Sequence, residues 1–170
     1  MRRSKPSAAE AEGAVVDEAA CTRVAVELLA RREHSRRELT RKLTARGFPD
    51  DVVSPVLDEL ERTGALADAR FTDSFVRSRI GKGQGPQRIR AELAQRGITN
   101  DEADGVLRAA DVDWLETIRA VRAKRFGPEL PRDYAERARQ ARFLQYRGFD
   151  SAQIRAALEF DADSDEVAGR

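Results

Sequence analysis

Few side chains in this sequence are of the kinds that perform catalysis or bind metal ions. His34 is the single histidine and Cys21 the single cysteine among 170 residues. A lone histidine with no acid placed beside it is a poor general base, and a lone cysteine is more often a small buried residue than a nucleophile. We therefore expect a structural or surface role for His34, a buried apolar role for Cys21, no internal disulfide and no zinc site.

Two further features invite a catalytic interpretation. Residues 81–85, Gly-Lys-Gly-Gln-Gly, have the composition of a phosphate-binding loop. They lack the P-loop order, in which Lys and then Ser or Thr follow the last glycine directly, and we interpret them as a flexible connection between helices. The adjacent carboxylates of Asp50 and Asp51 stand where a helix start is expected. The sequence therefore predicts a protein that is not an enzyme and that holds no cofactor or metal ion.

The elements that carry these residues follow from a unit of about 50 residues that occurs three times. A leucine precedes the glycine of each unit by four residues, and apolar residues follow the glycine at matching offsets. Glycine ends a helix readily because it enters the left-handed conformation without a Cβ penalty. The three copies are marked by the tripeptides Arg46-Gly47-Phe48, Arg96-Gly97-Ile98 and Arg147-Gly148-Phe149, which are 50 and 51 residues apart.

Each unit predicts three helices. One helix ends at the glycine, another precedes it, and a third follows with apolar residues at the i, i+3, i+4 and i+7 positions of one face. Helix-start signals agree with this division: residues 35–38 form a capping box, Asp68 and Asp113 are N-cap candidates, and Pro86 suits a first helical position. No segment alternates with period two, so we expect no strands.

The predicted fold class is all-α, with three tandem three-helix repeats forming an elongated, slightly curved array. Units of this size bury little surface alone, so neighbouring repeats should pack on each other. The predicted order is a disordered N-terminal tail at 1–14, repeats at 15–65, 66–111 and 112–161, and a disordered acidic C-terminal tail at 162–170.

Aromatic residues have two possible uses in such repeats. Phe71 and Phe75 share one helical face and suit a core, and Trp114, near a helix start, suits a core or a wedge between repeats. The alternative is that they stack on single-stranded bases, for which proteins use exposed aromatic side chains. We favour the core.

Charge is distributed unevenly within each repeat although the total is balanced. The 31 Lys and Arg residues face 30 Asp and Glu residues, and a net charge of +1 argues against a general polyanion binder. In every unit the middle helix is basic and the third helix is acidic; in the first, residues 35–46 carry +4 and residues 50–61 carry −5. Acids at helix starts and bases at helix ends complement the macrodipole and explain part of this pattern.

The macrodipole does not explain two groups of basic residues. Arg36 and Arg37 lie at a helix start, where positive charge is unfavourable, and residues 74–91 contain five basic side chains and no acid. We interpret these side chains as a basic stripe that meets an acidic or nucleic-acid surface of a partner. The candidate partner-binding residues are Arg36, Arg37, Arg41, Arg77, Arg79, Lys82, Arg88, Arg90, Arg137, Arg139 and Arg142.

The central segment resembles the RecX regulatory proteins of bacteria. The resemblance is carried by an Asp-x-Arg-Phe start at residues 68–71, the glycine-rich residues 81–85 and the glycine-ended helix through residue 98. Residues 35–48 and 142–149 are similar to that family's first and third repeats, so that the likeness spans roughly residues 22–160. The third copy departs most, because residues 132–134 replace the cap of the other two and Gln140 stands in the place of Leu39 and Ile89.

This resemblance implies a modulator, usually an inhibitor, of the RecA recombinase in recombination, repair and the SOS response. Such proteins lodge in the helical groove of the RecA–DNA filament, hinder ATP turnover and strand exchange, and cap or disassemble the filament. The expected partner is therefore the RecA nucleoprotein filament, with weak binding to single- or double-stranded DNA. Two alternatives remain: a helical protein that binds DNA directly without RecA, and a passive scaffold.

We expect a cytoplasmic monomer. No apolar run approaches the ~20 residues of a membrane span, and the basic start of the chain is followed by Ala and Glu rather than by an apolar signal core.

Overall fold

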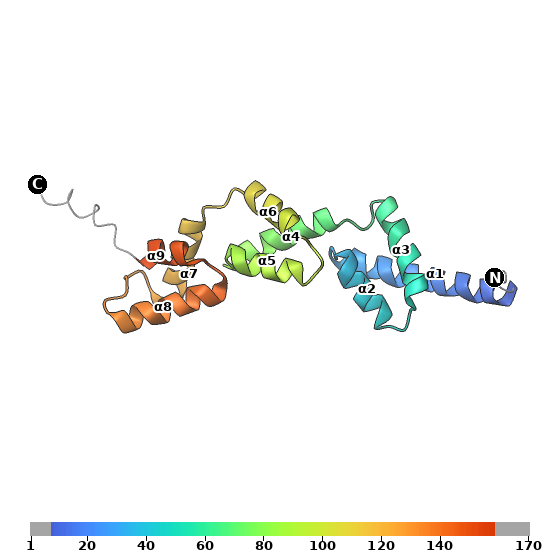
Figure 1. Ribbon diagram of the computed structural model, residues 1–170, viewed down its shortest axis with the longest axis horizontal. Coiled ribbons are helices and arrows are strands. Elements are labelled where there is room, and N and C mark those ends of the chain that lie inside the picture. Colours follow the sequence, from blue (N-terminus) through green and yellow to red (C-terminus); the bar gives the residue numbers. More distant parts are fainter. Residues whose placement is uncertain (1–7, 159–170) are drawn as a thin grey trace, which may run out of the picture. The chain divides into compact units, whose positions relative to one another are not determined.

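A computed structural model describes the backbone of residues 8–158 and the side chains of residues 17–158 (Figure 1). The described part holds nine α-helices and no strand, which confirms the all-α prediction. Helices α1–α3, α4–α6 and α7–α9 form the first, second and third repeats. Their bounds are α1 (Ala8–Arg31), α2 (Arg36–Thr44), α3 (Asp50–Arg62), α4 (Asp68–Gly81), α5 (Pro86–Ala94), α6 (Asn100–Ala109), α7 (Trp114–Phe126), α8 (Tyr134–Arg147) and α9 (Ser151–Leu158).

The two predicted tails relate differently to the described residues. Helix α1 begins at Ala8, so the N-terminal segment expected to lack structure, residues 1–14, overlaps the first turns of that helix. The C-terminal tail, residues 162–170, lies outside the described part of the chain.

The three predicted glycines follow the middle helices, but only α8 runs up to its glycine, whereas α2 and α5 end at Thr44 and Ala94, three residues before theirs. Gly47, Gly97 and Gly148 have φ values of 92°, 87° and 92°, in the left-handed region that glycine enters without strain. In each repeat the backbone N–H of the residue after the glycine donates to the carbonyl of the leucine that lies four residues before the glycine. These bonds run from Phe48 to Leu43 at 3.3 Å, from Ile98 to Leu93 at 3.2 Å and from Phe149 to Leu144 at 3.2 Å.

Helix starts agree with the prediction at most positions. Ser35 and Asp113 cap α2 and α7, and α5 begins at Pro86. The altered start of the third repeat keeps a cap, because the side chain of Asp133 accepts the N–H of Glu136 at 2.8 Å.

The expected N-cap role of Asp68 is wrong. Asp68 is the first residue of α4, and its carboxylate accepts the backbone N–H of Arg36 at 2.7 Å. Arg36 is the first residue of α2, so the carboxylate satisfies a helix start in the neighbouring repeat. Burial raises the pKa of Asp68. The backbone hydrogen bond from Arg36 lowers it by less, so the pKa remains raised.

The chain divides into two compact units. The first comprises Met1–Ser74 and Leu93–Glu102, and the second comprises Phe75–Glu92 and Ala103–Arg170. Each unit therefore holds one terminal repeat and part of the middle repeat. The first unit has a core from Cys21 to Leu66, in which Leu39, Leu43 and Leu57 are fully buried.

The second unit has its own core around α7, α8 and α9. Ile118, Leu144 and Phe149 are buried in it, and Trp114 packs against it, as expected of a core residue. Gln140 is also buried, at 4% exposure. A polar side chain thus occupies the position that Leu39 fills in the first repeat.

Candidate partner-binding surfaces

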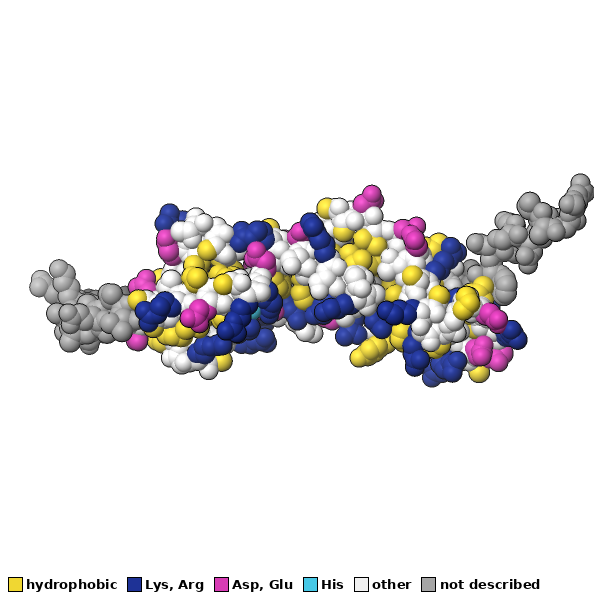
Figure 2. Space-filling model, turned by 180° about the vertical axis from the view of Figure 1, so that it is seen from behind, with side chains coloured by type: hydrophobic (Ala, Val, Ile, Leu, Met, Phe, Trp, Pro, Cys, Tyr) yellow, Lys and Arg dark blue, Asp and Glu magenta, His cyan; other side chains and the backbone are white. Residues whose placement is uncertain are grey.

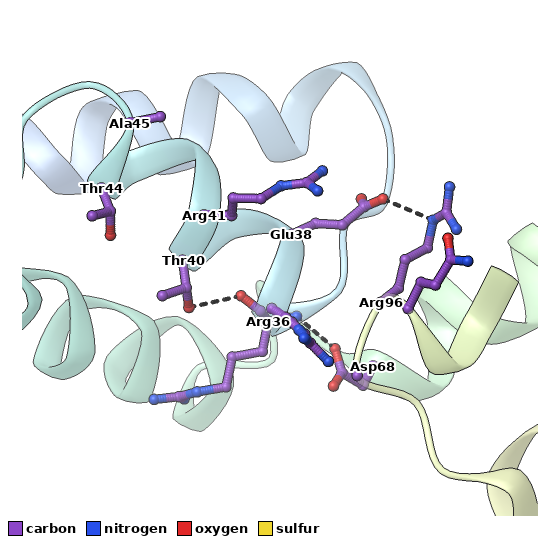
Figure 3. Close-up of a pocket in the computed structure, with 11 residues that line it drawn as sticks. Arg36, Glu38, Thr40, Arg41, Thr44, Ala45, Asp68 and Arg96 are labelled. Atoms are coloured by element: carbon purple, nitrogen blue, oxygen red, sulfur yellow. Dashed lines mark hydrogen bonds and ion pairs between the residues drawn. The ribbon is translucent and has the colours of Figure 1, made fainter. Parts of the chain in front are cut away.

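A hollow of about 960 Å³ lies in the first unit, between α2 and the turn that follows α5 (Figure 3). We call it the first-unit hollow. It is built at the junction of the first two repeats, where the glycine turn of one repeat approaches the middle helix of the other. Its lining residues are Arg36, Arg37, Glu38, Thr40, Arg41, Thr44, Ala45, Asp68, Gln95, Arg96 and Gly97.

Two of the predicted arginines that line this hollow have no ion pair within the described residues. Arg37 and Arg41 are four residues apart on α2, so they share one face of the helix. Both are exposed, and within the described part of the chain neither side chain has a hydrogen bond or ion pair. A Cβ on Gly97 would lie 3.1 Å from the Cβ of Arg37, so the absence of a side chain there leaves room for α2. The hollow therefore presents two guanidinium groups to a ligand.

Beneath them, Glu38 is the centre of a buried network. Its carboxylate lies 2.9 Å from Arg32 Nη1, 3.1 Å from His34 Nδ1 and 3.0 Å from Arg96 Nε. Figure 3 shows Arg96 reaching Glu38 from the turn after α5. The Ser35 hydroxyl donates to the carbonyl of Arg96 at 2.8 Å, which adds a second bond between the repeats.

This network corrects the expectation that His34 has no acid beside it. Burial lowers the pKa of His34, and the positive charges of Arg32 and Lys42 lower it further. Burial alone would raise the pKa of Glu38, but hydrogen bonds and charge from Arg32 and His34 outweigh it and the pKa is lowered. A neutral imidazole whose Nδ1–H donates to an ionised Glu38 satisfies both groups. Of the structural and surface roles predicted for His34, its burial confirms the structural one, although the premise that no acid lies beside it was wrong. A His-x-x-x-Glu spacing could have signalled the pair.

Arg36 has a role that the macrodipole argument did not consider. Its guanidinium lies 2.6 Å from the carboxylates of both Asp58 and Glu61 on α3. The same kind of pair joins Arg90 of α5 to Asp104 of α6 in the second unit. Part of the alternation between basic middle helices and acidic third helices therefore consists of ion pairs inside a repeat.

The run of basic residues 74–91 also has an acid within reach. Glu92, one residue beyond that window, lies 2.9 Å from Arg79 and 3.0 Å from Arg88. The guanidinium of Arg79 also lies 4.5 Å from the ring of Phe75. These two arginines thus have partners within the chain, while Arg77 and Lys82 are exposed.

The glycine-rich loop is a packed joint and not the flexible connection that we expected. Residues 84–86 are buried, and the N–H of Gly85 donates to the carbonyl of Arg147 at 2.8 Å. The N–H of Gln87 donates to Gly148 at 3.0 Å, and the guanidinium of Arg88 lies 5.1 Å from the ring of Tyr146. The loop therefore fastens the second repeat to the third.

The predicted arginines of the third repeat all lie on α8 and are exposed. Arg139 lies 5.5 Å from the ring of Phe126, and Arg142 donates to the carbonyl of Ala138 at 3.3 Å. Arg137 lines a separate hollow in the second unit. On the face shown in Figure 2, Lys and Arg side chains gather in several clusters.

Cys21 is fully buried, and burial, with the nearby charge of Glu18, raises the pKa of its thiol. No group of three or more His, Cys, Asp or Glu side chains is placed to hold a metal ion in the described part of the chain. None of its helices is both long enough and apolar enough to cross a membrane.

Comparison with known proteins identifies the repeats. Residues 21–60, 68–107 and 111–158 match the models for the first, second and third three-helix domains of RecX. A Regulatory protein RecX of Halorhodospira halophila is 52% identical over 145 residues, which is 85% of this chain and 89% of the relative. Another, from Pseudomonas entomophila, is 48% identical over 135 residues, covering 79% and 87%.

Solved structures show the same fold. A crystal structure of RecX from Lactobacillus salivarius aligns with a TM-score of 0.70 at 21% identity, covering 84% of this chain and 95% of that one. A second crystal structure, of a regulatory protein RecX, gives 0.76 at 21% identity over 93% and 81%. On the three domain matches and the close relatives, this chain belongs to the RecX family of regulatory proteins.

Proposed function

We propose that this protein binds the RecA–DNA filament and restrains its ATP turnover and strand exchange. Family membership supports a regulatory role, because the relatives are named regulatory proteins. The observation that carries the contact itself is the pair Arg37 and Arg41, whose guanidinium groups are exposed in the first-unit hollow. Guanidinium groups bind carboxylates and phosphates in a bidentate way, and a nucleoprotein filament offers both. The role would be exercised in the cytoplasm.

Some of the predicted contact residues form ion pairs inside the chain and others do not. Arg36, Arg79, Arg88 and Arg90 form ion pairs inside the chain, so reversing them would disturb the fold as well as any interface. We therefore assign the filament contact first to the residues that have no ion pair within the described chain. They are Arg37, Arg41, Lys82, Arg137, Arg139 and Arg142.

The test is a titration of RecA ATPase activity on single-stranded DNA with the doubly substituted Arg37→Glu, Arg41→Glu protein. Each exposed ion pair contributes about 0.2–1 kcal/mol, and reversal adds repulsion. The concentration for half-inhibition should therefore rise roughly 10-fold. The matched control is Arg23→Glu, Arg31→Glu, which makes the same charge change at exposed positions of α1 outside the hollow.

Two results would count against this proposal. Unchanged RecA activity at molar excess of the unsubstituted protein would exclude the function, and equal inhibition by the variant and control would exclude the site. Binding to DNA without RecA, with an affinity that falls steeply with salt between about 0.05 and 0.2 M, would instead favour a direct DNA-binding protein.

A further inference from the structure

A second hollow, of about 790 Å³, lies in the second unit between the end of α4, α7 and α8. We call it the second-unit hollow. Its floor is apolar, made of the half-buried side chains of Ile80, Val121 and Phe143. Gly83, at φ 69°, passes so close to this floor that a Cβ there would lie 2.6 Å from Val121 Cγ2. The loop backbone thus forms one wall of the hollow.

Cations surround this floor. Lys82, Lys124 and Arg125 line the hollow and are exposed, and within the described residues none of their side chains has a hydrogen bond or ion pair. Arg147 donates to the carbonyl of Lys82 at 2.9 Å, and its guanidinium lies 5.2 Å from the ring of Phe143. Glu116 is the one acidic side chain among the lining residues. The rim therefore carries an excess of positive charge that the chain itself does not neutralise.

The two hollows differ in chemistry. The first-unit hollow is lined mainly by arginine, threonine, glutamine and acidic side chains, with Ala45 and Gly97 as its small residues. It can bind anionic groups, but no large apolar side chain is among its lining residues. In the second-unit hollow an apolar floor lies inside a cationic rim, the arrangement by which interfaces take up a buried apolar anchor within a charged periphery.

We infer that the second-unit hollow binds an acidic segment of a protein partner, with one apolar side chain of that segment against Ile80, Val121 and Phe143. A duplex backbone would satisfy the rim but would leave the floor exposed to water, because phosphates and sugars bring no comparable apolar group and the paired bases are stacked inside the duplex. An unpaired base would stack on Phe143 instead, and the oligonucleotide measurement below separates that case. Carboxylates on both sides of the apolar side chain would meet Lys82, Lys124 and Arg125. Where this segment is assigned to the protein component of the filament, the inference rests on the proposed function.

The binding itself can be measured without RecA. The probes are two synthetic peptides, acetyl-Asp-Glu-Phe-Asp-Glu-amide and the same peptide with Gly in place of Phe. They are titrated into the full-length ¹⁵N-labelled protein while amide shifts are followed. The Phe peptide should shift the amides of Gly81, Gly83 and Val121 and bind at least ~10-fold more tightly than the Gly peptide, because its ring is removed from water. The variant Lys82→Glu, Lys124→Glu should abolish these shifts.

A charge-matched control keeps the result specific. Arg108→Glu, Arg155→Glu makes the same charge change at exposed positions of the same unit that do not line this hollow. It should bind the Phe peptide as the unsubstituted protein does. Equal binding of the Phe and Gly peptides, or shifts confined to other surfaces, would overturn the inference.

The same two variants test whether the second-unit hollow contributes to binding of the RecA filament. In co-sedimentation with RecA on single-stranded DNA, Lys82→Glu, Lys124→Glu should bind roughly 10-fold more weakly than the control, with unchanged affinity for a bare oligonucleotide. An equal loss for filament and oligonucleotide would identify a phosphate site and overturn the assignment to protein. If the protein binds the Phe peptide but does not bind or inhibit RecA, the proposed function is refuted, while the inference that the hollow binds an acidic segment with an apolar side chain is retained.

Discussion

Two glycines with the same φ should respond very differently to the same substitution. Gly47 and Gly148 both have φ 92° and lie in the turns that follow the middle helices of the first and third repeats. A Cβ on Gly47 would meet no atom within 4 Å. A Cβ on Gly148 would lie 2.5 Å from the backbone N of Arg88, and closer still to its Cβ. Gly47→Ala therefore tests backbone strain alone, and Gly148→Ala tests strain together with the joint between repeats.

The magnitudes follow from these contacts. An alanine in the left-handed region costs about 1–2 kcal/mol at either position. At Gly148 the backbone of Arg88 must also move away, which breaks the bonds from Gly85 to Arg147 and from Gln87 to Gly148. Each such bond contributes about 0.5–1.5 kcal/mol net, so Gly148→Ala should cost about 1–3 kcal/mol more than Gly47→Ala.

Native-state hydrogen exchange measures this difference at the joint itself. The amides of Gly85 and Gln87 exchange only when their bonds to the third repeat open. Gly148→Ala should raise the exchange rates of these two amides about 5- to 150-fold, and Gly47→Ala should leave them unchanged. Equal acceleration in the two variants would refute the reasoning, because it would mean that the close approach of Gly148 to Arg88 does not hold the joint.

Three further predictions concern stability and are read from urea unfolding. The pKa of His34 is lowered, chiefly by burial, so its contribution to the free energy of unfolding is present above the unfolded-state pKa of about 6.5 and is lost as pH falls. The urea midpoint should therefore drop between about pH 7 and 5, and His34→Gln should remove that part of the pH dependence. Gln140→Leu should raise the free energy of unfolding by about 1–2 kcal/mol, because the buried Gln140 Oε1 has no hydrogen-bond partner among the described residues; a lower free energy of unfolding would contradict this. Arg36→Ala should cost about 0.5–1 kcal/mol at low salt and less near 1 M NaCl, since its pairs with Asp58 and Glu61 are partly exposed; a salt-independent loss would point to packing instead.

The features that could be predicted from the sequence are those determined within one turn of chain. The bond that ends each middle helix joins residues five positions apart, so the glycine and the leucine before it are sufficient to predict it. The caps formed by Ser35 and Asp113 are local in the same way. The register of the three repeats was predictable for this reason.

Features that depend on how helices pack could not be read in this way. Asp68 caps a helix that begins 32 residues earlier in the sequence. Arg96 and Glu38 are 58 residues apart and meet only because two repeats are joined. The sequence correctly indicated basic residues on the middle helices, but it could not separate Arg37 from Arg36, whose charge is engaged by α3. Lys124 lies on the first helix of its repeat, outside the basic middle helices and residues 74–91, and its place in a hollow depends on the packing of α4, α7 and α8.

The two joints between repeats use corresponding positions but different chemistry. In both, the carbonyl of the arginine before the glycine accepts a hydrogen bond, from the Ser35 hydroxyl to Arg96 in the first joint and from the Gly85 N–H to Arg147 in the second. The first joint adds the carboxylates of Glu38 and Asp68, whereas the bonds described across the second end on backbone carbonyl oxygens.

Carboxylates can be protonated and backbone carbonyls cannot over the same range, so acid acts on these bonds of the first joint and leaves those of the second in place. The first-unit hollow lies on that first joint, and Arg96 and Asp68 belong to both. A ligand that binds Arg37 and Arg41 with its own anionic groups would therefore add negative charge beside a joint already held by two carboxylates. Its binding and the carboxylate bonds of the first joint are then electrostatically coupled. At the second joint the charged group is instead a donor, Arg147, which bonds the carbonyl of Lys82 and lines the second-unit hollow, so an anionic ligand there is attracted to the joint rather than repelled by it.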